Sequence, residues 1–266
     1  MEKYRKTFVT SDTHGMYKAL VQGLERAGFD KKTDRLIHLG DVADRGPHVF
    51  ECVQELLSIP NLVSLRGNHD DWFLKWMQTG AHPGRTQGGD ASIQSYLHYC
   101  QERHEPDYMT QAPLLFPEDH VKFFEQQLPY FIEGDRIFVH GGFDRHYLLK
   151  DQREPWVYWW DRDLWHQALS YKAMGVGLGY AEKGGKNIST FRIKEPCKEI
   201  FIGHTPTMLW DKKEFMQAGP IYNVDTGAGY GNLGRLCVLD IDTKEAFYSD
   251  NIYDLYPPHD QQFWNG

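Results

Sequence analysis

Aspartate, histidine and asparagine side chains follow five short apolar segments of this 266-residue chain. The five clusters read SDTHG, GDVADRG, RGNHD, VHGG and GHTP, and their candidate metal ligands are Asp12, His14, Asp41, Asn68, His140 and His204. These oxygen and nitrogen donors, without sulfur, suit Mn²⁺, iron or Zn²⁺ better than Ca²⁺, which prefers oxygen alone. The residue types therefore indicate a site for such a metal.

Each cluster stands where a strand is expected to end. Ligands of an open α/β sheet bind at the carboxyl ends of its strands, so the five clusters are expected to converge on one spot. Asp12 and His14 are two residues apart, and such residues point the same way on an extended chain. A single histidine more often packs in the core or lies on the surface, and Asp before Gly usually marks a turn. It is the five clusters in order that favour a metal site.

Strand and helix patterns alternate over the first 70 residues, which predicts crossover units and a mainly parallel start to the sheet. The expected strands cover residues 6–11, 35–40, 61–66, 130–133, 136–140, 199–203, 221–225, 235–239 and 246–249. The expected helices cover residues 16–28, 49–57, 71–76, 91–100 and 118–128. Within the glycine-rich residues 171–187, the runs GVGLGY and GGKN are expected to form surface loops.

The composition is that of a globular protein, with 41% hydrophobic residues. A net charge of -8 argues against general nucleic-acid binding, because phosphate backbones require an excess of Lys and Arg. The four cysteines form no CxxC pair and indicate free thiols in a reduced compartment: Cys52, Cys100, Cys197 and Cys237. We find no apolar stretch long enough for a signal peptide or a membrane span, so we expect a cytoplasmic protein.

The ordered set of clusters resembles the signature of the calcineurin-like metallophosphoesterases. Within that family it resembles the phosphoprotein phosphatase branch, most closely the short bacterial and phage enzymes related to bacteriophage lambda protein phosphatase. Bacterial symmetrical diadenosine tetraphosphatases share the same motifs. The resemblance implies an α/β fold, an α+β sandwich of two packed mixed β-sheets flanked by helices. It also implies a single metallophosphoesterase domain over residues 1–266, with a helical insertion at about 70–128.

The resemblance further implies two divalent metal ions, with Mn²⁺ as the expected metal and iron or Zn²⁺ as alternatives. Asp12, His14 and Asp41 would hold the first ion. Asp41 would also bridge to the second ion, and a shared carboxylate offsets the repulsion between two cations. The remaining ligands of the second ion would be Asn68, His140 and His204.

His69 is implied as the general acid that protonates the leaving oxygen, with Asp44 orienting its ring. Arg45 and Arg162 are implied as phosphate-binding residues. The alternative for Arg162, which lies in YWWDRDLW, is a surface ion pair with a neighbouring aspartate. Asp70 stands where the phosphoprotein phosphatases usually have glutamate.

The expected activity is that of a two-metal phosphomonoesterase acting on phosphoserine and phosphothreonine in proteins. A symmetrical dinucleoside polyphosphate hydrolase would use the same residues and is the alternative, and a metal-binding scaffold without catalysis is a remote third. The expected partner is a phosphorylated protein or a small phosphoester, with no nucleic acid and no membrane. Residues 143–160 shape the substrate cleft and depart from the pattern of both relatives. The sequence therefore leaves the substrate open, as it does the native metal and the oligomeric state.

Overall fold

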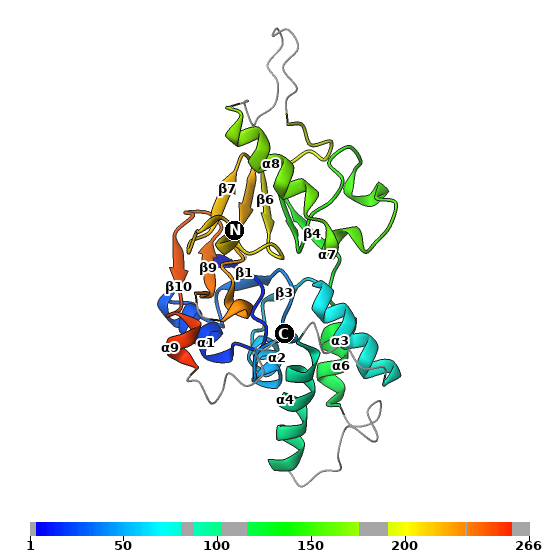
Figure 1. Ribbon diagram of the computed structural model, residues 1–266, viewed down its shortest axis with the longest axis vertical. Helices are drawn as coiled ribbons and strands as arrows, with labels where there is room; N and C mark the ends of the chain where they lie inside the picture. Colours follow the sequence, from blue (N-terminus) through cyan, green and yellow to red (C-terminus); the bar gives the residue numbers. More distant parts are fainter. Residues whose placement is uncertain (1–3, 81–87, 103–115, 176–190, 232, 257–266) are drawn as a thin grey trace, which may run out of the picture.

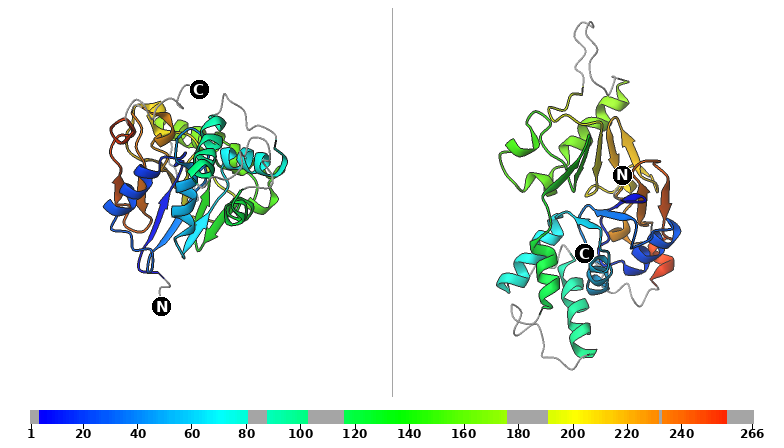
Figure 2. Two further views of the ribbon diagram at one scale, coloured as in Figure 1. Left: turned by 90° about the horizontal axis from the view of Figure 1, so that it is seen from below. Right: turned by 180° about the vertical axis from the view of Figure 1, so that it is seen from behind.

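The computed structural model describes residues 4–80, 88–102, 116–175, 191–231 and 233–256 of the chain. Within these residues, two five-stranded mixed sheets pack face to face, and helices cover the outer face of each sheet (Figure 1 and Figure 2). This confirms the two-sheet sandwich flanked by helices that the sequence predicted.

The first sheet has the strand order β10-β9-β1-β2-β3. Within this sheet, strands β1, β2 and β3 run parallel to one another, whereas β9 is antiparallel to β1 and β10 is antiparallel to β9. The crossover helices are α1 (Tyr17–Arg26) and α2 (Val49–Leu57), as the alternating pattern predicted. The strands are β1 (Thr7–Thr10), β2 (Arg35–His38), β3 (Leu62–Ser64), β9 (Cys237–Asp240) and β10 (Ala246–Tyr248).

The second sheet has the strand order β4-β5-β6-β8-β7, with β5, β6 and β8 parallel and the two edge strands antiparallel to their neighbours. The predicted hairpin is formed by β4 and β5, and it turns at Gly134, which has a φ of +60°. The strand β7 was not predicted, because it is only three residues long. The strands are β4 (Tyr130–Glu133), β5 (Arg136–Val139), β6 (Glu199–Ile202), β7 (Met216–Ala218) and β8 (Ile221–Asn223).

Among the described residues, three helices lie in the sequence between strand β3 of the first sheet and strand β4 of the second: α3 (Asn68–Thr79), α4 (Gly89–Glu102) and α6 (Glu118–Glu125). Helix α3 begins three residues earlier than predicted, because the Asp70 carboxylate accepts a hydrogen bond from the Gly67 N–H and caps the first turn. Helix α6 ends at Glu125 rather than at residue 128. No helix in the described part of the chain is long and apolar enough to span a lipid bilayer.

The segment after β5 is more helical than the sequence predicted. Helix α8 extends to Ala173, into the start of the glycine-rich segment, because Trp165 and Ala168 bury its inner face against the second sheet. Residues 176–187 of the same glycine-rich segment lie outside the described residues. The other helices of the described residues are α7 (Val157–Trp160), α8 (Asp163–Ala173) and α9 (Ile252–Leu255), with short 3₁₀ turns η3 (Leu149–Asp151), η4 (Thr207–Trp210) and η5 (Ala228–Tyr230).

The strands bury side chains on both faces. Along β5, Ile137 and Val139 pack on the helix side of the sheet, whereas Phe138 joins the layer between the two sheets. Phe138 stacks on Phe201 of β6 with ring centroids 5.0 Å apart, and Phe201 stacks on Tyr222 of β8 at 5.2 Å. This aromatic row holds the second sheet against the first.

Replacing Phe138 by alanine should lower the free energy of unfolding by about 3–5 kcal/mol, because the cavity would lie between the two sheets. Urea denaturation, followed by circular dichroism, measures the loss. Tyr253→Ala is the control, since Tyr253 is 46% exposed and its removal should change stability by less than about 0.5 kcal/mol. Equal losses in the two variants would contradict the assignment of Phe138 to the core.

Candidate metal centre

The predicted ligand residues come from both sheets and meet where the parallel strands end. The loops that follow β1 and β2 lie against each other, and the His204 N–H donates to Asp12 Oδ2 at 3.0 Å, which joins the second sheet to the first. All six predicted ligand residues are buried: Asp12, His14, Asp41, Asn68, His140 and His204.

Asp41 stands between two groups of potential ligand atoms. One group joins Asp41 to His14 and His69, and the other joins it to His140 and His204; the ligand atoms of each group lie within 4.8 Å of one another. The Asp41 Oδ2 atom is 3.6 Å from His14 Nε2 and 3.4 Å from His140 Nε2. One carboxylate therefore faces both groups.

The two other predicted ligands lie beside these groups. Asp12 Oδ1 is 3.9 Å from His14 Nε2, and Asn68 Oδ1 is 3.3 Å from His140 Nε2. The structure thus brings all six residues of the predicted set together. It also places His69 in the first group of potential ligand atoms, although the sequence assigned that residue to proton transfer.

Backbone carbonyl groups orient two of the histidine rings. His14 Nδ1 donates to the Ala43 carbonyl at 2.8 Å, and His140 Nδ1 donates to the Leu39 carbonyl at 3.1 Å. Because one ring nitrogen is engaged in this way, the Nε2 atom of each ring faces Asp41. Both carbonyls belong to the segment that carries Asp41 itself.

The charges of the site fit bound cations. Burial lowers the pKa values of His14 and His204 well below the usual range, so that both rings stay neutral, as metal ligands are. Burial alone would also lower the pKa of His140, but Asp41 and Asp12 raise it to about 9. The carboxylates of Asp41 and Asp12 therefore stabilise positive charge next to His140. The Nε2 atom of His204 is buried and has no hydrogen-bond partner among the described residues, which leaves it open to a metal.

The backbone of the site is strained. Six of the eight non-glycine residues with a left-handed φ in the described chain belong to the predicted site: Asp12, His14, Asp41, Asp44, Arg45 and His204. Such residues cost about 1–3 kcal/mol each and persist only where the surroundings hold them. The finding corrects the expectation that Asp12 and His14 project from one extended segment. Strand β1 ends at Thr10, and the chain then turns at φ values of 52° and 43°.

His69 forms a buried pair with Asp44. The His69 Nδ1 atom lies 2.8 Å from Asp44 Oδ2, and the Ser92 hydroxyl of α4 donates to Asp44 Oδ1 at 2.7 Å. The Asp44 N–H in turn donates to the Ser92 oxygen at 2.8 Å. On the other side of the ring, an Arg45 guanidinium nitrogen lies 3.3 Å from His69 Nε2.

The two predicted phosphate-binding arginines flank the centre from different elements. The Arg45 guanidinium lies 4.1 Å from the ring centroid of Tyr230, in η5. Arg162 donates to the His204 carbonyl and to the Thr205 hydroxyl, both at 2.9 Å. The surface ion pair that was the alternative for Arg162 is not formed with any described residue.

Aromatic rings line the side of the centre near α3 and α7. Trp72 packs on His69 with ring centroids 5.1 Å apart and on Trp160 at the same distance. Trp160 also lies 6.0 Å from the His204 ring and is 37% exposed. Trp165 is fully buried in the core, whereas Trp160 lies at the rim of the centre.

Sequence reasoning missed the residue that holds the Asp41 loop, which is Asp70. Its carboxylate accepts hydrogen bonds from the N–H groups of Asp41 and Val42 at 2.8 Å and of Ala43 and Gly67 at 3.1 Å. Burial, with a further effect of Asp41, raises the pKa of Asp70 to about 6. The one sequence signal was the place of Asp70 within RGNHD, where it was noted only as a departure from glutamate.

Two packed sheets that bring buried carboxylates and imidazoles together around one shared aspartate are the arrangement of a metal-binding centre. A family model described as calcineurin-like phosphoesterase matches residues 5–208. The chain belongs to the calcineurin-like phosphoesterase family, whose members are enzymes with a dinuclear metal centre.

Three curated relatives are similar to the chain. Serine/threonine-protein phosphatase 2 of Escherichia coli K12 is 39% identical over 88 residues, which are 33% of this chain and 40% of that protein. Serine/threonine-protein phosphatase 1 of Salmonella typhimurium is 26% identical over 247 residues, 90% of this chain and 94% of that protein. A symmetrical bis(5'-nucleosyl)-tetraphosphatase of Dechloromonas aromatica is 33% identical over 108 residues, 38% of each chain. The chain thus matches less than half the length of the first and third relatives.

A solved structure shows the same fold. The metallophosphoesterase from Sphaerobacter thermophilus has a TM-score of 0.50 at 20% identity, over 92% of this chain and 87% of that chain. At this identity the likeness concerns the fold alone.

Replacing Asp70 by asparagine should lower the free energy of unfolding by about 2 kcal/mol or more, because an amide N–H₂ would face backbone N–H groups that need an acceptor. Urea denaturation of the chelator-treated protein measures this loss. The control is Asp71→Asn on the next residue, which weakens the ion pairs of Asp71 with Lys75 at 2.6 Å and with Arg66 at 4.0 Å and should cost less, about 0.3–1 kcal/mol. Similar losses in both variants would refute the role of Asp70 in holding the loop.

Proposed function

We propose that this protein is a two-metal phosphomonoesterase that removes phosphate from phosphoserine and phosphothreonine in proteins. The observation that carries the proposal is the sharing of Asp41 between two groups of buried ligand atoms, beside a histidine–aspartate pair. The Salmonella typhimurium relative, named a serine/threonine-protein phosphatase, is similar over nearly the whole of both chains and supports the choice of substrate.

Six residues would hold the metal pair. Asp12, His14 and Asp41 would bind one ion, and Asp41 would bridge to the other. When bound, the ions supply the positive charge that activates water as a nucleophile and offsets the charge of the phosphate oxygens. We propose Mn²⁺ as the metal, because the ligands mix carboxylate, amide and imidazole donors. The second ion would be completed by Asn68, His140 and His204.

His69 would move the proton. Its Nδ1 atom is paired with Asp44, and its Nε2 atom, which lies 3.3 Å from an Arg45 guanidinium nitrogen, would donate the proton to the leaving oxygen of the substrate. The Asp44 carboxylate, itself held by Ser92, would orient the ring and stabilise the imidazolium before transfer. Arg45 and Arg162 would bind the phosphate oxygens, Arg45 from the loop after β2 and Arg162 from the segment before α8.

A symmetrical dinucleoside polyphosphate hydrolase is the second candidate. It is supported by exposed aromatic rings near the centre, since nucleobases stack on such rings. A pocket of about 550 Å³ beside Arg162 is lined by Trp156 and Trp160, which are 53% and 37% exposed. Tyr230 is 44% exposed on the side of Arg45. The Dechloromonas aromatica relative bears the name of this activity but matches only in part.

The domain assignment is part of the same proposal. We take residues 1–266 as one metallophosphoesterase domain with a helical insertion at about 70–128. The buried layer shared by the two sheets supports this reading, as does the supply of metal-site residues from both sheets. The cytoplasmic location expected from the sequence stays a prediction.

The substrate test compares two compounds on the same enzyme. After chelator treatment the protein should be inactive, and Mn²⁺ should restore hydrolysis of a phosphothreonine peptide with a kcat/KM at least tenfold above that for diadenosine tetraphosphate. Zn²⁺ and Fe²⁺ are tested in parallel to identify the metal. The control is Asp41→Asn, which should lose both metal binding and turnover with the shared charge. A preference for diadenosine tetraphosphate would move the protein to the second candidate, and inactivity on every phosphoester with metal bound would favour a non-catalytic scaffold.

Replacing His69 by asparagine should leave the bound metal content intact while kcat on an alkyl phosphate falls by roughly 10²–10⁴-fold, the range for a lost general acid. The loss should be smaller on p-nitrophenyl phosphate, whose leaving group needs little protonation. His166→Asn, an exposed histidine of α8, is the matched control and should retain full activity. An unchanged kcat on the alkyl phosphate would remove His69 from proton transfer.

A further inference from the structure

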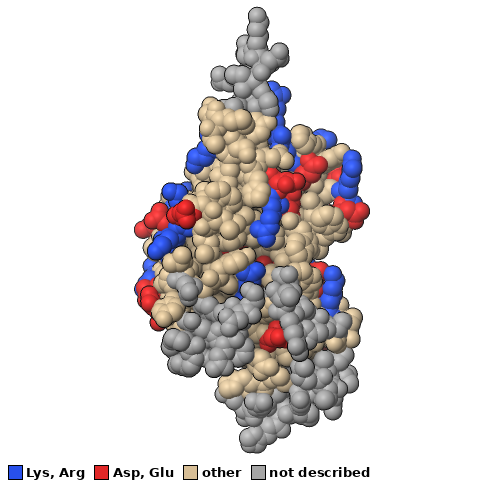
Figure 3. Space-filling view, viewed as in Figure 1, with Lys and Arg blue, Asp and Glu red and all other residues tan. Residues whose placement is uncertain are grey.

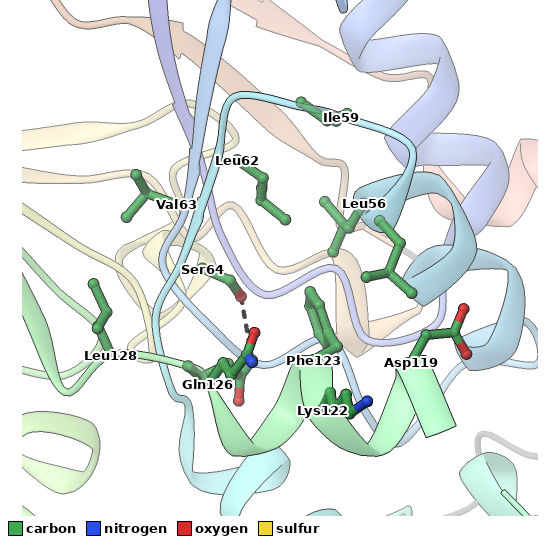
Figure 4. A pocket seen from close by; sticks show the side chains of 12 residues that line it. Leu56, Ile59, Leu62, Val63, Ser64, Asp119, Lys122, Phe123, Gln126 and Leu128 are labelled. Carbon is green, nitrogen blue, oxygen red and sulfur yellow. Dashed lines mark hydrogen bonds between the residues drawn. The ribbon is translucent and has the colours of Figure 1, made fainter. Parts of the chain in front are cut away.

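Gln127 lies at the junction between helix α6 and strand β4, at the inner side of an apolar groove. The groove has a volume of about 480 Å³ and runs between the edge strand β3, the end of α2 and α6 (Figure 4). Figure 4 shows Leu56, Leu62 and Phe123 among its walls, with Ser64 on β3. Gln127 is 6% exposed, whereas its neighbour Gln126 lines the same groove but is exposed to solvent.

The amide of Gln127 is oriented by a charge. Its Nε2 atom donates to Asp70 Oδ2 at 2.9 Å and, more weakly, to the Ser64 hydroxyl at 3.4 Å. A carboxylate can only accept, so the amide nitrogen must face it, and Gln127 Oε1 is then left buried without a partner among the described residues. Leaving a buried acceptor unpaired destabilises the fold, and such a group calls for an explanation.

The explanation lies in what Asp70 does. The same Oδ2 atom that accepts from Gln127 also accepts from the N–H of Asp41, while Oδ1 accepts from Val42 and Ala43. Asp41 carries the carboxylate shared by the two ligand groups, and the Ala43 carbonyl orients the His14 ring. A shift of the Asp70 carboxylate would therefore move groups of the metal centre directly.

We propose that Gln127 is a positioning residue of the metal centre, which acts through Asp70 on the backbone that carries Asp41. The inference rests on the proposed function, since it takes the Asp41 cluster to be the metal site. The end of the helical insertion is thereby part of the catalytic apparatus. The hydrogen-bond relay runs from Gln127 to Asp70 and on to Asp41 and Ala43.

The test compares Gln127→Met and Gln127→Glu with the same substitutions at Gln126. Methionine keeps the length of the side chain in an apolar setting but donates nothing, and glutamate places a second acceptor against Asp70. Both changes at position 127 should raise the dissociation constant for Mn²⁺ by about 10–100-fold in calorimetric titration of the chelator-stripped protein, the range for partners of metal ligands. The position 126 variants should bind Mn²⁺ as the wild type does.

A second readout needs no metal. Amide hydrogen exchange of residues 41–43, whose N–H groups all donate to Asp70, should be faster in Gln127→Met and unchanged in Gln126→Met. A variant that lowers the melting temperature while keeping wild-type Mn²⁺ affinity and wild-type exchange at 41–43 would assign Gln127 a structural role only and overturn the proposal. If the wild-type protein bound none of Mn²⁺, Zn²⁺ and Fe²⁺, the proposed function would fail, and hydrogen exchange would still decide whether Gln127 holds the loop.

The relay through Asp70 is tested by a double-mutant cycle. Adding Gln127→Met to an Asp70→Asn background should cause no further change in exchange at residues 41–43, because the link is already broken. Additive effects of the two substitutions would show that Gln127 acts by another route and would overturn the proposed path. Should Asp70→Asn fail to fold, the exchange and metal affinity of the Gln127 variants alone decide the question.

Discussion

The structure depends on one buried negative charge at the junction of two sheets. The Asp41 carboxylate follows β2 of the first sheet and faces His140 and His204, which follow strands of the second. A carboxylate removed from water needs positive charge close by. Asp41 and Asp12 raise the pKa of His140, and His140 in turn lowers the pKa of Asp41. The contact between the sheets and the affinity for cations therefore have the same physical origin.

Hydrogen bonds at this junction stabilise the strained backbone that positions the side chains of the site. The left-handed residues after β1 and β2 aim short side chains at a common point, which no regular strand could do. Backbone bonds between the loops hold the strained segments, since Asp12 N–H donates to the Gly40 carbonyl and His14 N–H to that of Asp41, both at 2.9 Å. A Cβ on Gly67 would collide with the Asp41 carboxylate, so α3 can begin there only with glycine.

The helical segment that connects β3 to β4 in the sequence does more than cover the first sheet, because it supplies side chains that support the metal centre. Helix α4 supplies Ser92, which holds Asp44 and through it His69. The residue after the end of α6, Gln127, is bonded to Asp70, the acceptor for the Asp41 loop. Each of the two groups proposed for chemistry, the metal cluster and the proton donor, is therefore supported by a polar side chain from this helical segment.

The sequence alone determined the identities of the clustered side chains, because strands that end in polar residues present them at one edge of a sheet. The family and the two-sheet sandwich followed from the resemblance of the ordered motif set to a known family. The sequence predicted the crossover helices and the hairpin from local patterns. It could not predict the turn at Asp12 and His14, the early start of α3 or strand β7, because backbone strain, caps and short strands are decided by neighbours distant in sequence. The tertiary structure alone showed that Ser92, Asp70 and Gln127 support the centre. The contacts of Asp70 with Asp41, of Ser92 with Asp44 and of Gln127 with Asp70 join residues that are 29, 48 and 57 positions apart in the chain. Local sequence patterns cannot predict such contacts.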